Sequence, residues 1–309
     1  MVFEGSEKKI EIVVSPTIGD LRLRGRFYWE KIVSKCNAEI ISEVKNDKMI
    51  AYLLSESSLF VWENSILMIT CGKTSLVNSL IEFVRDFGVL NIENVIFQRK
   101  NEYYSHLQVS NFYDDLELLK SYLSGHAWRL GELDGHHNFV FYYEQNENEF
   151  QNDKTLELLM YNLNDIVGEK LRSENLNLSN IREILGFDQL FNDYQIDDFL
   201  FSPFGYSVNG IKGDSYFTIH MTPEQDGSYV SFETNDDELD QNVVVKHFIS
   251  TLEPKSFDTI CFNLPQLEQI ENHTLINKCN HEISKKMNVS FAQHINNPVA
   301  KTTTSYQLL

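Results

Sequence analysis

The chain has 309 residues, of which 42% are hydrophobic and 12% aromatic, so it can bury a large core. Its formal net charge of −19 at pH 7 argues against a nucleic-acid groove, which needs a basic surface. It contains no run of about 18 apolar residues, so we expect no membrane-spanning helix.

The four cysteines, Cys36, Cys71, Cys261 and Cys279, have no C-x-x-C spacing and are too sparse for a disulfide scaffold. Free thiols in a reducing, cytoplasmic compartment are the simpler interpretation. The N-terminus has an acid and two lysines followed by an alternating strand pattern, which is unlike a signal peptide. The sequence therefore predicts a cytoplasmic protein.

Strand-like segments recur along the chain, with amphipathic stretches between them. The expected strands are residues 9–15, 38–44, 49–62, 65–72, 94–100, 138–145, 215–223, 227–235 and 258–264. The expected helices are residues 74–88, 114–123, 155–163 and 237–251. Several strands follow one another at hairpin distance, and several are apolar on both faces. We therefore expect antiparallel sheets covered by helices. No linker divides the chain, so we expect a single domain over residues 1–309.

The first expected strand carries a charged row. Alternation places Glu7, Lys9 and Glu11 on one face, opposite Ile10 and Ile12. On a sheet with one solvated face, this row would face water. On a sheet covered on both faces, the charges would be buried and would have to be paired.

The segment IAYLLSESSLFVW places four polar residues, Ser55 to Ser58, inside an otherwise apolar strand. A serine hydroxyl beside its own preceding carbonyl can attack it and convert the amide to an ester. Loss of the serine Cα proton then expels the upstream carboxylate, and the resulting dehydroalanine hydrolyses to a pyruvoyl group. This chemistry needs donors for the oxyanion and a base for the proton. A polar break in a buried strand suits it, although the letters ESS alone do not establish it.

Three other side chains are candidates for chemistry, each with a purely structural alternative. Cys71 lies at the end of an expected strand, just before a helix. It is either a small buried core residue or a reactive thiol. His220 lies on the polar face of an expected strand, and Ser207 lies in a Gly-rich loop before it. The stretch GYSVNG is a poor nucleophile elbow, because Asn209 replaces the required glycine and a strand follows. A serine hydrolase built on Ser207 is therefore disfavoured.

Together, these stretches resemble the eukaryotic S-adenosylmethionine decarboxylase proenzyme family. The motifs occur in the family's order and are FEGSEK (3–8), YLLSESSLFV (52–61), TCGKT (70–74), FGYSVNG (204–210) and YFTIHMTPE (216–224), followed by SYVSFETN (228–235). The resemblance implies an α+β fold, a four-layer α/β/β/α sandwich of two antiparallel sheets flanked by helices. The last 70 or so residues are less distinctive.

The resemblance also implies autocatalytic cleavage between Glu56 and Ser57. Residues 1–56 would form a β chain and residues 57–309 an α chain. Ser57 would become the pyruvoyl group, a covalent cofactor, and the family needs no metal.

Further residues receive roles only through the resemblance. His220 would be the base of the elimination, Ser207 would stabilise the oxyoxazolidine intermediate, and Cys71 would protonate the product carbanion. The substrate would contact the family's adenine, ribose and acidic positions, which are here Phe3, Phe201, Glu224, Glu4 and Glu7. The implied reaction decarboxylates S-adenosylmethionine, through a Schiff base with the pyruvoyl group, to the aminopropyl donor of spermidine and spermine biosynthesis.

Some members of the family are activated by putrescine, bound in a buried acidic cluster between the sheets. The corresponding acids here are Glu11, Asp153, Glu157 and Glu233. Ile69 replaces the lysine expected two residues before the cysteine. Lys9 occupies a position that is basic in plant-type members, which do not need putrescine. We hypothesise that Lys9 supplies the cation internally, the alternative being that it faces solvent.

The alternative function is a regulatory paralogue, catalytically weak or dead, that activates a catalytic subunit by heterodimerisation. The presence of Ser57, Cys71, Ser207 and His220 favours an active enzyme. The resemblance alone also suggests a homodimer.

Overall fold

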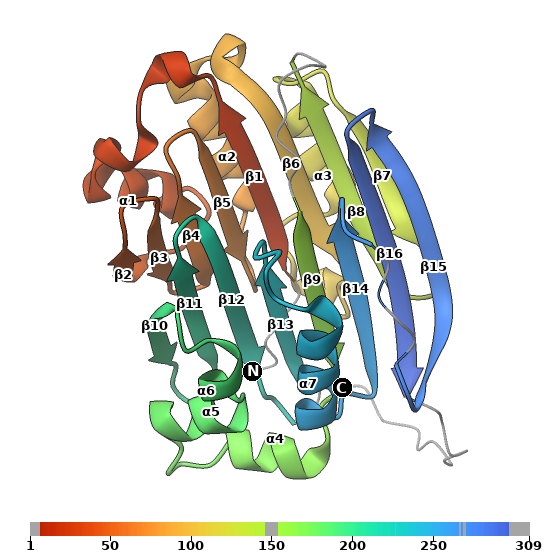
Figure 1. Cartoon of the computed structure of the whole chain (residues 1–309). Helices are drawn as coiled ribbons and strands as arrows, with labels where there is room; N and C mark the ends of the chain where they lie inside the picture. The colour runs from red at the N-terminus through yellow and green to blue at the C-terminus, as the bar shows by residue number, and fades with distance from the viewer. Residues whose placement is uncertain (1–6, 146–153, 226, 266, 268–269, 297–309) are drawn as a thin grey trace.

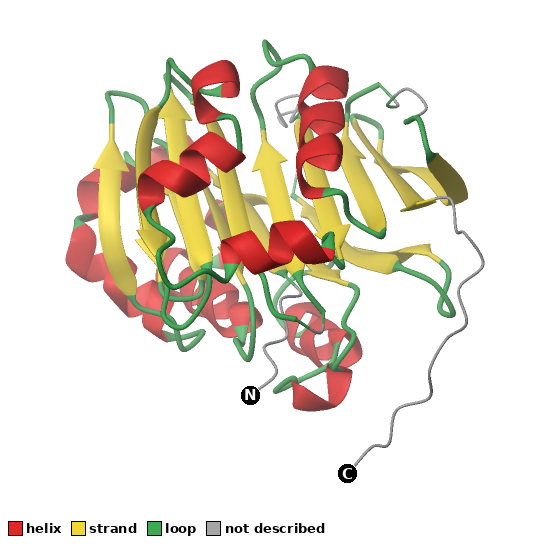
Figure 2. Cartoon of the chain, turned by 90° about the horizontal axis from the view of Figure 1, so that it is seen from below, coloured by secondary structure: helices red, strands yellow, loops and turns green. Residues whose placement is uncertain are grey.

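The computed structural model describes residues 7–145, 154–225, 227–265, 267 and 270–296. This part of the chain forms two eight-stranded antiparallel sheets that face each other, with helices on the two outer faces (Figures 1 and 2). The expected four-layer α+β sandwich is therefore confirmed.

The first sheet, sheet A, is built from the first half of the chain. In spatial order its strands are β2 (Ile40–Lys45), β3 (Ile50–Leu54), β4 (Ser57–Val61), β5 (Ser65–Thr70), β1 (Lys8–Val14), β6 (Ile92–Lys100), β8 (His137–Glu144) and β7 (His126–Gly131). Its outer face packs against α1 (Arg26–Ser34), α2 (Leu76–Phe87) and α3 (Phe112–Lys120).

The second sheet, sheet B, is built from the second half. In spatial order its strands are β10 (Gln195–Leu200), β11 (Tyr206–Lys212), β12 (Ser215–Thr222), β13 (Tyr229–Thr234), β9 (Thr155–Tyr161), β14 (Ser256–Phe262), β16 (Met287–Asn296) and β15 (His273–Ser284). Its outer face packs against α4 (Asp165–Leu171), α5 (Leu178–Ile184), α6 (Phe187–Leu190) and α7 (Gln241–Leu252).

The two sheets have the same strand order. Adding eight to each strand number of sheet A gives the order of sheet B. The chain therefore traces one topology twice, and the two copies face each other across the central layer.

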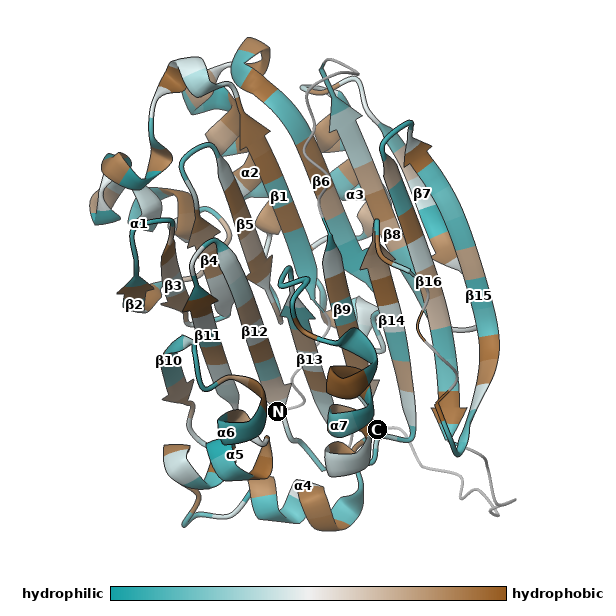
Figure 3. Cartoon of the chain, in the orientation of Figure 1, coloured by the Kyte–Doolittle hydropathy of each residue, from teal (hydrophilic) through white to brown (hydrophobic). Residues whose placement is uncertain are grey.

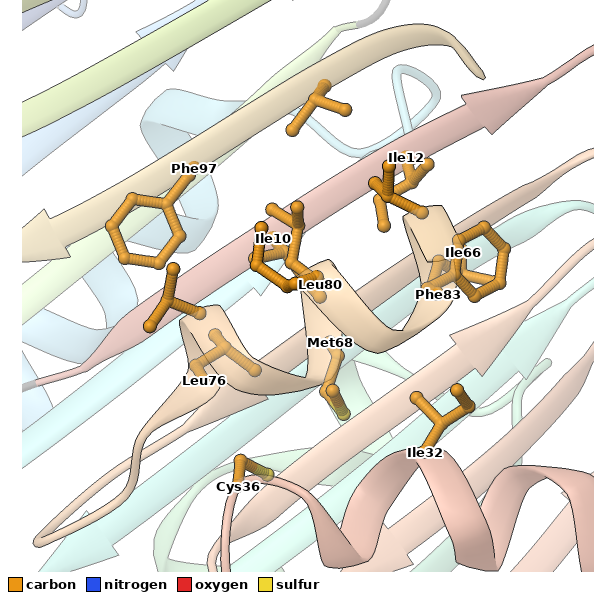
Figure 4. Close-up of a cluster of buried hydrophobic side chains, with 14 of the residues drawn as sticks. Ile10, Ile12, Ile32, Cys36, Ile66, Met68, Leu76, Leu80, Phe83 and Phe97 are labelled. Atoms are coloured by element: carbon orange, nitrogen blue, oxygen red, sulfur yellow. The ribbon is translucent and has the colours of Figure 1, made fainter. Parts of the chain in front are cut away.

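Strand β1 shows how the sequence pattern produces the layers. Ile10 and Ile12 point to the outer face, where they join Leu76, Leu80 and Phe83 of α2 in one buried cluster (Figure 4). Helix α2 ends where expected, because Gly88 has φ 78° and its N–H donates to the Val84 carbonyl at 2.8 Å.

The layer between the sheets has apolar ends and a polar middle. Ile96, Val140 and Ile260 belong to one apolar cluster, and Phe60 and Ile211 belong to the other. Hydropathy colouring shows the hydrophobic residues concentrated on the central strands, with more hydrophilic edge strands such as β15 (Figure 3). The polar middle holds Glu7, Lys9, Gln98, Lys100, Glu157, Asn209, Thr218, His220, Ser231 and Glu233, all less than 5% exposed.

Two expected elements are wrong. Residues 155–163 were expected to form a helix, but residues 155–161 form the central strand β9, buried along its whole length. A short apolar run fits the periodicity of a helix as well as that of a strand. Here the segment forms a strand because it is buried on both faces of the sheet. Residues 49–62 were expected to form one strand but form the hairpin β3–β4. Leu54 pairs with Ser57, so Ser55 and Glu56 make the turn.

Elements missing from the sequence-based assignment are mostly edge strands and short helices. They are β7, β10, β11, β15, β16, α1, α4, α5 and α6. Among the described residues, no helix has the length and apolar character to cross a membrane.

The α2 core makes a direct stability prediction. Leu80 is fully buried beneath the helix, so Leu80→Ala should lower the free energy of unfolding by about 2–5 kcal/mol. Leu90→Ala is the matched control, because Leu90 is 83% exposed and its loss should change stability by less than about 0.5 kcal/mol. Urea unfolding of both variants tests this, each made together with Ser57→Ala so that the chain stays uncut. Equal effects would contradict the packing described.

Candidate active site

The Glu56–Ser57 bond lies where the β3–β4 turn enters strand β4. Ser57 has φ 142°, a conformation that L-residues rarely adopt. The other described non-glycine residues with positive φ are asparagines and one glutamate, with φ between 44° and 65° in the left-handed helical region. Such a conformation costs about 1–3 kcal/mol, so the backbone is strained at this serine.

The carbonyl of the Glu56–Ser57 peptide bond is polarised by a backbone donor. The Cys71 N–H, just after β5, donates to the Glu56 carbonyl at 2.8 Å. Ser57 is 2% exposed, and within the described structure its hydroxyl has no hydrogen-bond partner of regular geometry.

Cys71 is a buried, protonated thiol. Burial raises its pKa well above the usual value, and the negative charge of Glu7 raises it further. The neighbouring Ser57 hydroxyl has a smaller, opposite effect on this pKa, although the pair lacks regular hydrogen-bond geometry. At neutral pH this thiol can donate a proton.

Lys8 fixes the loop that follows the thiol. Its ammonium donates to the Gly72 carbonyl at 3.0 Å and to Oε1 of Gln108 at 2.7 Å. Burial lowers the Lys8 pKa to about 8, and the charge of Arg99 acts in the same direction.

His220 lies across from this hairpin, on strand β12. Its Nδ1 is 3.0 Å from the Ser207 hydroxyl, because Ser207 and His220 are register partners on β11 and β12. Its Nε2 is 2.9 Å from the Thr218 hydroxyl and 3.3 Å from the Ser58 hydroxyl. Burial lowers its pKa to about 3, with a further contribution from the charge of Lys100. The ring is therefore neutral at pH 7.

One sequence-based expectation needs correction here. Ser207 is on strand β11 rather than in a loop, because the backbone becomes extended immediately after Gly205. The neighbouring Ser58 bridges the sheets by donating to Asn209 Oδ1 at 2.6 Å and by contacting His220.

Glu7 also joins the two sheets. Its carboxylate accepts a short hydrogen bond from the Ser231 hydroxyl and lies 3.3 Å from the Lys100 ammonium. Burial raises its pKa, while Lys100 and Ser231 oppose the rise. Ser231 is the register partner of His220, so Glu7 lies beside the histidine strand.

Lys9 is fully buried among three carboxylates. Its ammonium is 2.5 Å from Glu11, 2.9 Å from Glu157 and 2.8 Å from Glu233. Burial alone would lower its pKa, but the three negative charges outweigh burial and raise the pKa well above the usual value. The alternative in which Lys9 faces solvent is therefore wrong.

Lys100 links this charge cluster to the cleavage region. Its ammonium is 2.8 Å from Glu157 and 3.3 Å from Glu7. The two lysines together lower the pKa of Glu157 despite its burial, whereas burial and the charge of Glu157 raise the pKa of Glu233 to about 7.

A cavity of about 1210 Å³ opens beside the charge cluster rather than at the cleavage site. Its lining includes Glu11, Trp62 and Tyr216 but none of the four candidate catalytic side chains. It provides a route from outside toward Glu11.

The remaining expected residues are placed only in part. Phe201 is half-buried and packs edge-to-face on Phe199, with ring centroids 4.9 Å apart. Glu224 is half-buried just beyond β12. The predicted Phe3, Glu4 and Asp153 lie outside the described residues.

The family model for adenosylmethionine decarboxylase matches residues 1–308. The chain belongs to the adenosylmethionine decarboxylase family. The S-adenosylmethionine decarboxylase proenzyme of Xenopus laevis is 34% identical over 280 residues, covering 84% of this chain and 83% of the relative. The S-adenosylmethionine decarboxylase proenzyme of Dictyostelium discoideum is 32% identical over 277 residues, covering 82% of this chain and 73% of the relative.

A solved structure is similar in fold. The crystal structure of the Trypanosoma brucei AdoMetDC-delta26 monomer has a TM-score of 0.61 and 23% sequence identity, covering 77% of this chain and 98% of that chain. The expected family and its decarboxylase class are thus confirmed, while the role of each site residue stays a prediction.

Sequence reasoning missed four residues of this candidate site, namely Ser58, Lys100, Asn209 and Thr218. A signal existed for Lys100, since it ends the expected strand NVIFQRK and would be buried in a sheet covered on both faces. Thr218 shares a strand face with His220, and the same alternation could have identified it. Ser58 and Asn209 meet only across the sheets, which no local pattern reveals.

The buried, neutral His220 predicts a specific pH dependence. Its pKa is about 3 in the folded chain and near 6.5 when unfolded, so the unfolded state binds more protons between these values. Its contribution to stability therefore falls as the pH drops below about 6.5, by about 1.4 kcal/mol per pH unit.

His220→Gln, made in an uncut Ser57→Ala background, removes this titration. Relative to that variant, the His220 protein should lose more than about 1 kcal/mol between pH 7 and pH 5, as measured by urea unfolding. Parallel stability curves for the two proteins would show that the histidine is not held neutral.

Proposed function

We propose that this chain is a self-processing, pyruvoyl-dependent S-adenosylmethionine decarboxylase. The observation that supports it most is the Glu56–Ser57 peptide bond. Its serine has φ 142°, and its carbonyl accepts the Cys71 N–H at 2.8 Å. A strained backbone and a polarised carbonyl are what an attack by the following hydroxyl requires.

Processing would begin with attack of the Ser57 Oγ on the Glu56 carbonyl carbon. The Cys71 N–H would stabilise the oxyanion, and the Ser207 hydroxyl, as an additional donor, would stabilise the oxyoxazolidine ring. Collapse breaks the C–N bond and leaves an ester between the Glu56 carboxyl and the Ser57 side chain. The Ser57 nitrogen leaves as a free amine after taking up a proton.

Elimination would then remove the Ser57 Cα proton, with His220 as the base. The C–H electron pair forms the Cα=Cβ bond, the Cβ–O bond breaks, and Glu56 leaves as a carboxylate. Tautomerisation of the dehydroalanine and hydrolysis of its imine release ammonia and leave a pyruvoyl group at residue 57. Burial keeps the His220 ring unprotonated at pH 7, which is the state that can accept this proton.

In the decarboxylation itself, the pyruvoyl group would supply the electron-withdrawing carbonyl that accepts the electrons released as CO₂ leaves. The chain's own residues would bind, orient and protonate. Cys71 would deliver the proton to the product carbon, and its raised pKa keeps that proton on Sγ until needed. Phe201, with Phe3, would stack on the adenine, and Glu224 would bind the ribose hydroxyls.

The net charge of −19 and the buried Glu7, with Glu4 of the same motif, suit a substrate that carries a sulfonium cation. The product would be the aminopropyl donor for spermidine and spermine synthesis. Cytoplasmic location remains a prediction from the cysteines and the N-terminal pattern, and homodimerisation remains a prediction from the resemblance.

We further propose that Lys9 replaces a diamine activator. Its ammonium lies within 2.9 Å of Glu11, Glu157 and Glu233, and Lys100 adds a second internal cation beside Glu157. Each carboxylate of the acidic cluster is thus paired with a lysine of the chain itself. An added putrescine would find its carboxylates already paired.

Intact mass of the purified protein tests self-processing. We expect two chains that separate between residues 56 and 57, with the larger chain blocked at its N-terminus. Ser57→Ala should remain one chain and release no CO₂ from S-adenosylmethionine, whereas Ser55→Ala, which alters the other side of the turn, should still be cut.

An uncut wild-type chain that activates a second, catalytic subunit would instead support the regulatory paralogue. CO₂ release by Ser57→Ala would refute the pyruvoyl mechanism.

Putrescine titration tests the role of Lys9. The unmodified protein should show less than twofold activation of processing and decarboxylation. Lys9→Ala leaves several buried carboxylates with one lysine fewer, so it should lower the melting temperature and slow both reactions. Putrescine should restore part of each loss, because a diamine fits the vacated position.

Lys31→Ala is the matched control, since Lys31 is 41% exposed on the outer surface and should behave like wild type. Strong activation of the unmodified protein by putrescine would contradict the proposal.

A further inference from the structure

The hydroxyl groups around the His220 ring determine which nitrogen can act as the base. Thr218 Oγ lies 2.9 Å from the Val208 carbonyl, which can only accept a hydrogen bond. Asn209 Oδ1, which also only accepts, lies 3.2 Å from the same hydroxyl, so the single Thr218 proton goes to one of these two oxygens. The same hydroxyl lies 2.9 Å from His220 Nε2, so it offers that nitrogen a lone pair.

The second hydroxyl near Nε2 is committed in the same way. Ser58 Oγ donates to Asn209 Oδ1 at 2.6 Å, a short bond to an amide oxygen. Its distance to His220 Nε2 is 3.3 Å, so it too presents a lone pair. Ser58, Asn209 and Thr218 are each 1% exposed or less, so bulk solvent does not compete for these hydrogen bonds.

Nδ1, on the other side of the ring, meets a different partner. The Ser207 hydroxyl is 3.0 Å away, and it can donate to a nitrogen that carries no proton. A neutral imidazole has one donor and one acceptor nitrogen, so two lone pairs at Nε2 place the proton there.

We propose that Thr218 and Asn209 are positioning residues that hold His220 as the Nε2–H tautomer, so that Nδ1, beside Ser207, is the basic nitrogen of the processing reaction. The proposal rests on the role of His220 as base, given above. The proton that leaves the Ser57 Cα therefore ends on Nδ1, while Nε2–H remains bonded to Thr218. The resulting imidazolium donates to hydroxyl oxygens on both sides.

The tautomer can be measured without any activity. Long-range ¹⁵N–¹H correlation on ¹⁵N-histidine-labelled Ser57→Ala protein distinguishes protonated from unprotonated ring nitrogens, and a His220→Gln spectrum assigns the signal. We expect a protonated Nε2 and an unprotonated Nδ1. The reverse pattern would overturn the inference, whether or not the chain processes itself.

Variants at residue 218 test the consequence for processing. Thr218→Val keeps the volume but removes the oxygen that accepts from Nε2, so conversion of the ester intermediate should slow at least tenfold. The ester would accumulate as a species that hydroxylamine cleaves at residues 56 and 57. Thr218→Ser should restore conversion to within about threefold of wild type, and Asn209→Leu should slow it in the same direction as Thr218→Val.

Thr234→Val is the matched control. Thr234 is also a buried strand threonine whose hydroxyl donates to a backbone carbonyl, that of Tyr216 at 2.6 Å, but it belongs to a site away from His220. It should process at the wild-type rate.

Unchanged ester conversion in Thr218→Val, together with ester accumulation in His220→Ala, would refute the positioning role of Thr218 but not the role of His220 as the base. Absence of ester in His220→Ala would instead refute the base assigned under Proposed function.

Discussion

Charge pairing across the central layer is the constraint on which the rest of the molecule depends. Lys9 and Lys100 belong to sheet A, while Glu157 and Glu233 belong to sheet B. A buried carboxylate without a cation is strongly destabilising, so the sheets can face each other only in an arrangement that brings these groups together. Apolar side chains at both ends of the layer supply contact area, but apolar contact is not directional.

The same pairing places the reactive groups. Residues of the cleavage hairpin come from sheet A, and the histidine and its serine partner come from sheet B. Lys100 contacts both Glu157 and Glu7, and its charge helps to keep His220 neutral. The charge of Lys100 therefore acts both on the carboxylates around Lys9 and on the groups at the cleavage site. This coupling requires no conformational change.

The sequence predicted the layers where periodicity was clear and failed where burial was uniform. The alternation of β1 separated Ile10 from Lys9 correctly, and the helix ending at Gly88 followed from ordinary capping chemistry. Strand β9 was missed because every one of its residues is buried, which removes the alternation that identifies a strand. The β3–β4 turn was missed because it uses Ser55 and Glu56 rather than glycine or proline.

For the site, the family motifs led to Ser57, Cys71, Ser207 and His220, and the fold brings the strands that carry them together. The motifs did not lead to Ser58, Asn209 or Lys100, because their contacts are between sheets and depend on how two copies of one topology face each other. The local sequence around each residue carries no information on which side chains of the opposite sheet it will meet.

The order of strands in sheet A has a consequence for the cut chain. Residues 1–56 carry β1, β2 and β3, but β4 and β5 of the other fragment lie between β3 and β1. Once cleaved as proposed, the two fragments would be interleaved within one sheet, and the short fragment could leave only by breaking three ladders. After denaturation the two fragments would separate, so refolding would require two chains to associate. The folded state of the cut protein would therefore be maintained by slow unfolding rather than by a folding equilibrium.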